Sequence, residues 1–359
     1  MDDSGSSGSS EPLRESEQDL LRLAPPADGA LAVAGDTIVV ACCDTFHRNP
    51  GGVYAVTGTG AMLWRAGAEV VADADPVLGP MGLVYVCSTD AYCYALSLAD
   101  GQIRHRYLGN EYGSAPAIGA DGTVFIGTHD DGLLAQSKEG RVLWTESTLG
   151  ETFSPVLAPW GTIVVGSVLG TTGYLSSLRL DGTVLWSNEV NGVVSHPPCL
   201  SANGIYTNSS SGVTRAISPG GDTLWEVPTR CPWNSFPVLG NGGEIFCTSN
   251  DGALICINQD GLVAWEFRGE DQLSASPTVG RDGIVYVGSL EGSLLAISSA
   301  GALLWKLDVG SPVYAAAAEL GTGRVAVGSH AGVLTCFLPD GTKEWSLPLQ
   351  ERWNSLRGC

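Results

Sequence analysis

The chain has 359 residues, of which 18 are Lys or Arg and 38 are Asp or Glu, so its formal net charge is −20. The imbalance comes from scarce lysine, since only Lys138, Lys306 and Lys343 occur. Long-range repulsion therefore argues against nucleic acid and anionic membrane surfaces as partners. No apolar run reaches the roughly 18 residues that a membrane-spanning helix needs.

The N-terminal segment, residues 1–26, is acidic and rich in Ser and Gly, and we expect it to be flexible. It has neither the basic start nor the apolar stretch of about 7 to 15 residues found in signal peptides. The sequence as given therefore predicts a cytoplasmic protein. The alternative is a periplasmic or extracellular protein, if this chain is a processed form.

A motif of the form G-x-x-x-W recurs with a period of about 40 residues. The steps between successive positions are 41, 39, 42, 39, 40, 40 and 40 residues, so no copy holds an insertion longer than a turn residue or two. One copy, GQIRH, has His105 at the Trp position. The other copies end in Trp64, Trp144, Trp186, Trp225, Trp265, Trp305 and Trp345.

Each copy is predicted to form four short strands. In the seventh copy these are SASPTVG (274–280), IVYVGS (284–289), SLLAI (293–297) and ALLWKL (302–307), separated by turns. Asp-Gly pairs such as Asp181-Gly182 suit the positive φ of tight hairpins. Eight copies of four strands predict an all-β protein, an eight-bladed β-propeller of four-stranded antiparallel blades that forms one domain over residues 27–359.

The C-terminal tail carries a partial ninth repeat. WNSLRG (353–358) begins eight residues after Trp345, as WNSFPVLG begins eight residues after Trp225. We therefore expect the tail to lie at the seam between the last and first blades, beside GALAVAG (29–35), and to help close the ring.

The succession S-x-P, V-Y-V-G-S, D-G-x-L-x-A and G-x-x-x-W resembles the repeat of the PQQ-like, or quinoprotein-type, β-propeller family over about 320 residues. That family includes quinoprotein alcohol dehydrogenases, a propeller lipoprotein of the bacterial outer-membrane barrel-assembly machinery, and sensor or scaffold propellers. The resemblance implies that the seven Trp residues dock between neighbouring blades. A large aromatic residue can bury about 150–250 Å² in such a place.

The stretch ACCDTFHRN (41–49) resembles the Cys-Cys-Asp stretch of quinoprotein dehydrogenases, in which a vicinal disulfide lies against the quinone. On this resemblance, Cys42 and Cys43 are candidates for binding PQQ, and calcium would be bound together with the quinone. Trp64 follows only 21 residues after Cys43, however, and the blades have almost no insertions that would shape a pocket. Neither a calcium-binding Glu/Asn pair nor a catalytic residue can be placed, so we expect no cofactor.

Two further cysteine pairs flank equivalent hairpin turns. Cys87 and Cys93 lie around one turn and Cys247 and Cys256 around another, so either pair could lie across neighbouring strands. No Cys/His group has the spacing of a zinc site. Buried thiols would fit a reducing compartment and disulfides an exported protein, and the sequence permits both.

The segments that join one blade to the next share a face with the hairpins between second and third strands. Aromatic and Arg residues gather in these connectors, and such residues are enriched in protein-binding hot spots. Alternatively, they plug the mouth of the channel. The candidate partner-binding rim comprises Tyr112, Phe153, His196, Arg230, Trp233, Asn234, Tyr314 and Trp353. His129 and His330 fall in hairpin turns on the same face, too far apart in a ring to share a metal.

These observations favour a non-catalytic scaffold that presents this rim to a protein or peptide partner. The alternative is a PQQ-binding quinoprotein oxidoreductase or a degenerate relative of one. The five His residues have no Ser motif near them in the sequence, which argues against a hydrolase triad.

Overall fold

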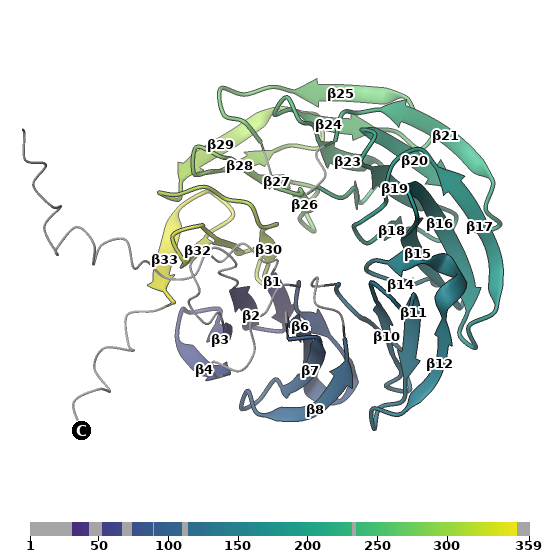
Figure 1. Cartoon of the computed structure of the whole chain (residues 1–359). Helices are drawn as coiled ribbons and strands as arrows, with labels where there is room; N and C mark the ends of the chain where they lie inside the picture. The colour runs from purple at the N-terminus through teal and green to yellow at the C-terminus, as the bar shows by residue number, and fades with distance from the viewer. Residues whose placement is uncertain are drawn as a thin grey trace, which may run out of the picture.

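The protein is a ring of eight antiparallel β-sheets, seen in Figure 1 with the first blade in purple and the last in yellow. This computed structural model describes residues 31–42, 52–66, 74–88, 90–109, 114–231, 235–273 and 275–349. Every predicted repeat forms one blade, which confirms the eight-bladed β-propeller. The predicted flexible segment 1–26 and the tail expected at the seam lie outside the described residues.

The strands of the first four blades run in chain order from the centre of the ring outward. Blade one contains β1 (Leu31–Ala34), β2 (Thr37–Cys42), β3 (Gly52–Thr57) and β4 (Met62–Ala66). Blade two contains β5 (Val77–Leu78), the 3-10 turn η1 (Pro80–Gly82), β6 (Leu83–Ser88), β7 (Tyr92–Ser97) and β8 (Ile103–Leu108). Blade three contains β9 (Ala117–Ile118), β10 (Val124–Gly127), β11 (Leu133–Gln136) and β12 (Val142–Glu146), followed by η2 (Ser147–Leu149). Blade four contains β13 (Glu151–Thr152), β14 (Val156–Leu157), β15 (Thr162–Leu169), β16 (Thr172–Arg179) and β17 (Val184–Val190).

The second half of the ring repeats this arrangement. Blade five contains β18 (Cys199–Leu200), β19 (Ile205–Ser209), β20 (Val213–Ile217) and β21 (Thr223–Pro228). Blade six contains β22 (Val238–Leu239), β23 (Ile245–Thr248), β24 (Leu254–Ile257) and β25 (Val263–Phe267). Blade seven contains β26 (Thr278–Val279), β27 (Val285–Gly288), β28 (Ser293–Ile297) and β29 (Leu303–Asp308). Blade eight contains β30 (Ala318–Glu319), β31 (Val325–Gly328), β32 (Val333–Phe337) and β33 (Lys343–Pro348).

The innermost strands are shorter than the sequence pattern predicts. In blade seven the strand is only Thr278–Val279, although the apolar pattern begins at Ser274. Pro277 stands directly before it, and a proline has no backbone N–H to donate to the ladder. A proline stands in the same place before β5, β9, β14, β18 and β22.

Blade four departs from the four-stranded pattern. Its central hairpin is the longest in the ring, with eight residues each in β15 and β16. The extra length of β15 pairs with β13 at Glu151 and Thr152, so this sheet has five strands.

The apolar core consists of eight layers, each packed between two neighbouring blades. Seven layers contain one of the repeat tryptophans, whose indole Nε1 donates to a backbone carbonyl of the next blade at 2.8–3.1 Å. The layer between blades two and three has no tryptophan. His105 pairs with Ala95 across β7 and β8, in the register that pairs Trp64 with Ala55 in blade one.

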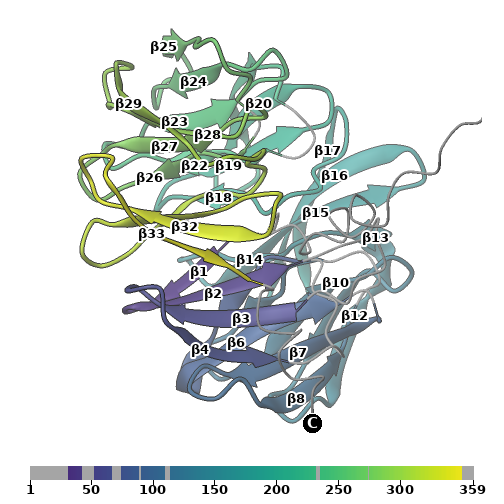
Figure 2. The same ribbon diagram turned by 90° about the vertical axis from the view of Figure 1, so that its left-hand side faces the viewer.

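The two ends of the propeller meet between blade eight and blade one. Figures 1 and 2, which are related by a quarter turn, both place β33 beside the first blade. A buried cluster joins Ile38 and Val40 of β2 to Leu334 and Cys336 of β32. Neither of the short 3-10 turns, nor any other described segment, is a helix long and apolar enough to cross a membrane.

Candidate functional site

The blade connectors and the hairpins between second and third strands lie on one face of the ring and are hydrogen-bonded to each other. Asn250 N, in the hairpin of blade six, donates to Arg230 O in the connector before it at 2.7 Å. His330 N, in the hairpin of blade eight, donates to Pro312 O at 2.8 Å. Because these two connectors are tied to the next hairpin, their side chains are carried by short, anchored segments of this face, which we call the connector face.

The structure describes four of the eight predicted rim residues. Tyr314 is 37% exposed, and its ring lies 5.5 Å from that of His330 in an edge-to-face contact. His196 is half-buried with its ring 6.2 Å from Phe236, and Phe153 is also half-buried. The predicted rim residues Tyr112, Trp233, Asn234 and Trp353 lie outside the described residues.

Arg230, the fourth described rim residue, belongs to a charged cluster. Its side chain is 74% exposed, and its φ of +54° falls in the left-handed region that few residues other than glycine adopt. Arg230 Nη1 lies 3.1 Å from Asp251 Oδ2, and Arg268 Nη2 lies 2.9 Å from the same oxygen. Arg268 also forms an ion pair with Glu266.

The carboxylate of Asp251 is the acceptor that joins this cluster. A hydrogen bond from Ser249, together with the hydrogen bond and charge of Arg268, lowers the pKa of Asp251 to about 2. A polar recess of about 170 Å³ lies beside it, between Thr229 and Arg230 on one side and Glu266 and Arg268 on the other. Sequence reasoning identified Arg230 but missed Arg268, because Arg268 follows β25 and meets Asp251 only through the fold.

A second ion pair lies close to the connector face at blade seven. Asp271, whose side chain is 7% exposed, accepts a hydrogen bond from Lys306 Nζ at 2.6 Å and from Ser289 Oγ at 3.3 Å. Burial by itself raises the pKa of this carboxyl, but the bonds from Lys306 and the neighbouring serines hold it below its usual value. Asp271 is therefore a structural link between connector and blade.

Only one of the two quinone-binding candidates lies within the described residues, and it is buried between blades. Cys42 is the last residue of β2 and is fully buried in the layer between blades one and eight, with Tyr54, Leu334 and Cys336. Cys43 lies outside the described residues. Over the described part of the chain, no group of three or more His, Cys, Asp or Glu side chains is placed to hold a metal ion.

The two cysteine pairs predicted around hairpin turns differ from each other. Cys87 and Cys93 are directly opposite on β6 and β7, both fully buried in one layer. Cys247 instead pairs with Ile255, and Cys256 pairs with Phe246. Because successive residues of a strand point to opposite faces, Cys247 and Cys256 lie in different layers, and that pair is not cross-strand.

Comparisons with known proteins agree with this architecture. A family model described as outer membrane protein assembly factor BamB matches residues 14–212 and 209–356. No curated protein matches the sequence.

Three solved structures illustrate the likeness. BamB from Moraxella catarrhalis has 17% identity and a TM-score of 0.68, with 86% of this chain and 94% of that chain covered. The computationally designed Ika8 protein has 16% identity and a TM-score of 0.72, covering 88% and 98%. Quinohemoprotein alcohol dehydrogenase from Comamonas testosteroni has 13% identity and a TM-score of 0.69, covering 88% and 71%. At these identities the likeness shows the fold alone.

Proposed function

Because the chain belongs to the PQQ-like β-propeller family whose model is described as outer membrane protein assembly factor BamB, we propose that it is a non-catalytic scaffold whose connector face binds a protein or peptide partner. The observation that carries this proposal is the exposed Arg230, held in a left-handed conformation by a connector that is bonded to the next hairpin. Backbone strain of this kind persists where the surrounding structure holds it, and it clusters at binding sites.

The chemistry of the connector face also supports a protein partner. The guanidinium groups of Arg230 and Arg268 both bind the carboxylate of Asp251. Tyr314 and His330 form an exposed aromatic pair on the same face. Arg and Tyr are enriched in the residues that dominate binding energy at protein interfaces. Arg230 and Pro312 lie in connectors whose backbone is bonded to the next hairpin, so little conformational entropy is lost when this part of the face binds. The matching family model is described as an assembly factor, which is consistent with a scaffold.

The alternative, a quinone oxidoreductase, finds little support at Cys42. A planar cofactor could reach this sulfur only by displacing the Tyr54 and Leu334 side chains packed around it. The expectation of no PQQ and no calcium rests on this packing and on the sequence departures described above. A titration of the protein with pyrroloquinoline quinone and calcium, followed by tryptophan fluorescence, tests it. Saturable binding that is lost in Cys42→Ala/Cys43→Ala would favour the oxidoreductase.

The scaffold is tested by site-specific photo-crosslinking in the native cells. The crosslinking amino acid is placed at Tyr314 on the connector face or at Arg281 on the opposite face, where Arg281 lies in the turn before β27. A partner crosslinked from residue 314 is identified by mass spectrometry and purified. Its Kd is then measured for the wild type and for three variants, Arg230→Ala, Tyr314→Ala and Arg281→Ala.

We expect Arg230→Ala and Tyr314→Ala to weaken binding by about tenfold or more, and Arg281→Ala to leave the Kd within about twofold. Loss of Arg230 should also lower the association rate and its salt dependence, as for a charge at an interface rim. Equal crosslinking from both faces, or a Kd that neither connector-face variant changes, would contradict the proposal.

A further inference from the structure

The contact between blades two and three is built differently from the other seven. In those seven, an indole donates to a carbonyl in the last hairpin of the next blade and covers a glycine of the same hairpin. Between blades two and three, the corresponding carbonyl is that of Lys138, and it accepts a bond of 2.9 Å from the hydroxyl of Tyr107. Tyr107 therefore replaces the hydrogen bond of the missing indole. The smaller imidazole of His105 does not reach the glycine that an indole covers in the other contacts.

The hairpin glycines reveal the unfilled space. At Gly182, a Cβ atom would lie 2.9 Å from the Trp144 ring, because the indole lies flat against the glycine. At the equivalent Gly140, a Cβ atom would meet only the carbonyl oxygen of Arg106, at 3.3 Å. The face of Gly140 is thus free of the ring that covers its counterparts.

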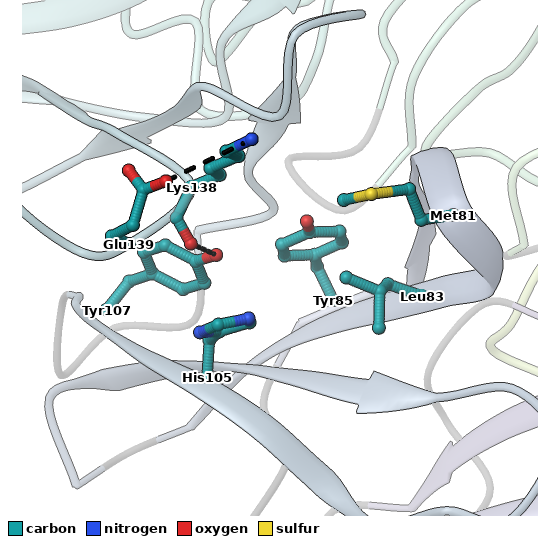
Figure 3. A pocket seen from close by; sticks show the side chains of 7 residues that line it. All are labelled: Met81, Leu83, Tyr85, His105, Tyr107, Lys138 and Glu139. Atoms are coloured by element: carbon teal, nitrogen blue, oxygen red, sulfur yellow. Dashed lines mark hydrogen bonds and ion pairs between the residues drawn. The ribbon is translucent and has the colours of Figure 1, made fainter.

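A pocket of about 220 Å³ opens at this place, and we call it the His105 groove (Figure 3). Leu83, Tyr85 and Tyr107 form its walls, and all three are buried. The rings of Tyr85 and Tyr107 lie 6.0 Å apart, and the His105 ring lies 6.3 Å from that of Tyr107. Three aromatic rings around one apolar space can contact the faces and edges of another flat ring.

The mouth of the His105 groove combines a polar side and a flexible apolar side. Lys138 and Glu139 form a weak ion pair at 4.0 Å on one side, and both are more than half exposed. Met81 stands on the other side, 74% exposed and with a φ of +59°. An exposed methionine in a strained backbone conformation is unusual, and methionine sulfur makes favourable contacts with aromatic rings.

We propose that the His105 groove binds the side chain of a tryptophan presented by a partner polypeptide. The seven equivalent positions show which ring this architecture accepts there, and Glu139 offers an acceptor for the indole N–H. An apolar cavity of about 150 Å³ can hold benzene, so 220 Å³ leaves room for a bicyclic ring. Pockets for whole small-molecule ligands are generally larger, about 300–1,000 Å³, which favours one protruding side chain.

This site is separate from the connector face, although it shares with the proposed function the idea that a protein partner supplies the ligand. The test therefore begins without any partner. N-acetyl-5-fluorotryptophanamide is titrated with the full chain and its fluorine resonance is followed by NMR. The affinity expected for one buried ring is on the order of millimolar.

Variants decide where the ring binds. His105→Trp fills the groove with the chain's own indole. We expect this variant to abolish the broadening of the probe's fluorine resonance that binding causes, and to raise the Tm of the protein. Trp265→His creates the same vacancy between blades six and seven, and we expect two equivalents to bind. Arg230→Ala should leave the binding unchanged, which separates this site from the connector face. Absence of saturable binding, or equal binding by His105→Trp, would overturn the site.

A competition experiment then tests whether the bound ring can belong to a polypeptide. A Gly/Ser-flanked peptide with one central tryptophan should displace the fluorinated probe, and the same peptide with alanine should not. If the probe binds at the groove but the tryptophan peptide does not compete, a polypeptide occupant is ruled out and the groove takes a small aromatic molecule instead.

Discussion

Trp345 of the last blade donates its indole N–H to Gly58 O of the first blade at 2.9 Å, although 287 residues separate them in the chain. The same carbonyl accepts a bond of 2.6 Å from Arg324 Nη1, and Arg324 Nη2 lies 2.8 Å from Asp36 Oδ1. Arg324 is only 12% exposed. The described seam thus contains the same Trp contact as six other blade contacts, with one largely buried arginine added.

Replacement of this arginine should loosen the ring. We expect Arg324→Ala to lower the free energy of unfolding by about 2 kcal/mol, because Asp36 and Glu344 lose a charged hydrogen-bonding partner and a cavity forms. Arg281→Ala, which removes an exposed arginine between blades seven and eight, should change it by less than about 0.5 kcal/mol. Urea unfolding followed by tryptophan fluorescence measures both, and equal midpoints for the two variants would contradict a special role of the seam.

Blade two should be the least firmly docked of the eight blades. An imidazole at position 105 buries less apolar area than an indole, so local opening of β8 requires less free energy. Hydrogen exchange measured by mass spectrometry should therefore be faster for amides of β8 than for those of β25 and β29. Tyr107→Phe removes the bond to Lys138 O and should increase the difference. Equal protection of the three strands would show that Tyr107 alone restores full docking.

The period of the sequence was sufficient to predict the blade number, the strand order and the place of His105 in β8. These features follow from local alternation and from spacing, which the sequence displays directly. The substitution of Tyr107 for the indole hydrogen bond was missed, although a signal existed, since residues two apart lie on the same face of a strand. Arg268 with Asp251 and Arg324 with Gly58 could not be predicted, because only closure of the ring brings these residues together.

The loss of stability between pH 4 and pH 2 should depend on the cluster around Asp251. The pKa of Asp251 is about 2 in the folded protein, below its ordinary 3.8, so the carboxylate contributes stability above pH 4 that is lost as the pH falls toward 2. Arg268→Ala should raise this pKa toward 3.8, measured by carbon NMR of the Asp251 carboxyl. It should also reduce the decrease of Tm between pH 4 and pH 2. An unchanged pKa would show that Ser249 alone sets it.

The buried cysteines Cys256 and Cys336 should be almost inert toward alkylation while the protein is folded. Burial raises the pKa of Cys256 to about 12, and burial together with Glu344 raises that of Cys336 to about 11, from an ordinary value of 9.0. Only the thiolate reacts, and each pKa unit lowers its population tenfold, so at pH 8 both should react with iodoacetamide at least about 100-fold more slowly than in the unfolded chain.

The measurement is mass spectrometry of tryptic peptides after timed alkylation, with the protein unfolded in concentrated urea as the reference for full reactivity. Cys93, whose pKa is raised by burial and by its neighbour Cys87, should behave in the same way. The protection should persist in Arg230→Ala, which changes only the connector face. In Arg324→Ala it should fall at Cys336, because loosening of the seam exposes this thiol and outweighs the loss of the Arg324 charge, which lowers the Cys336 pKa. A native rate within tenfold of the unfolded rate at Cys336 would mean that the seam opens readily, and it would also weaken the stability expected from the Arg324 contacts.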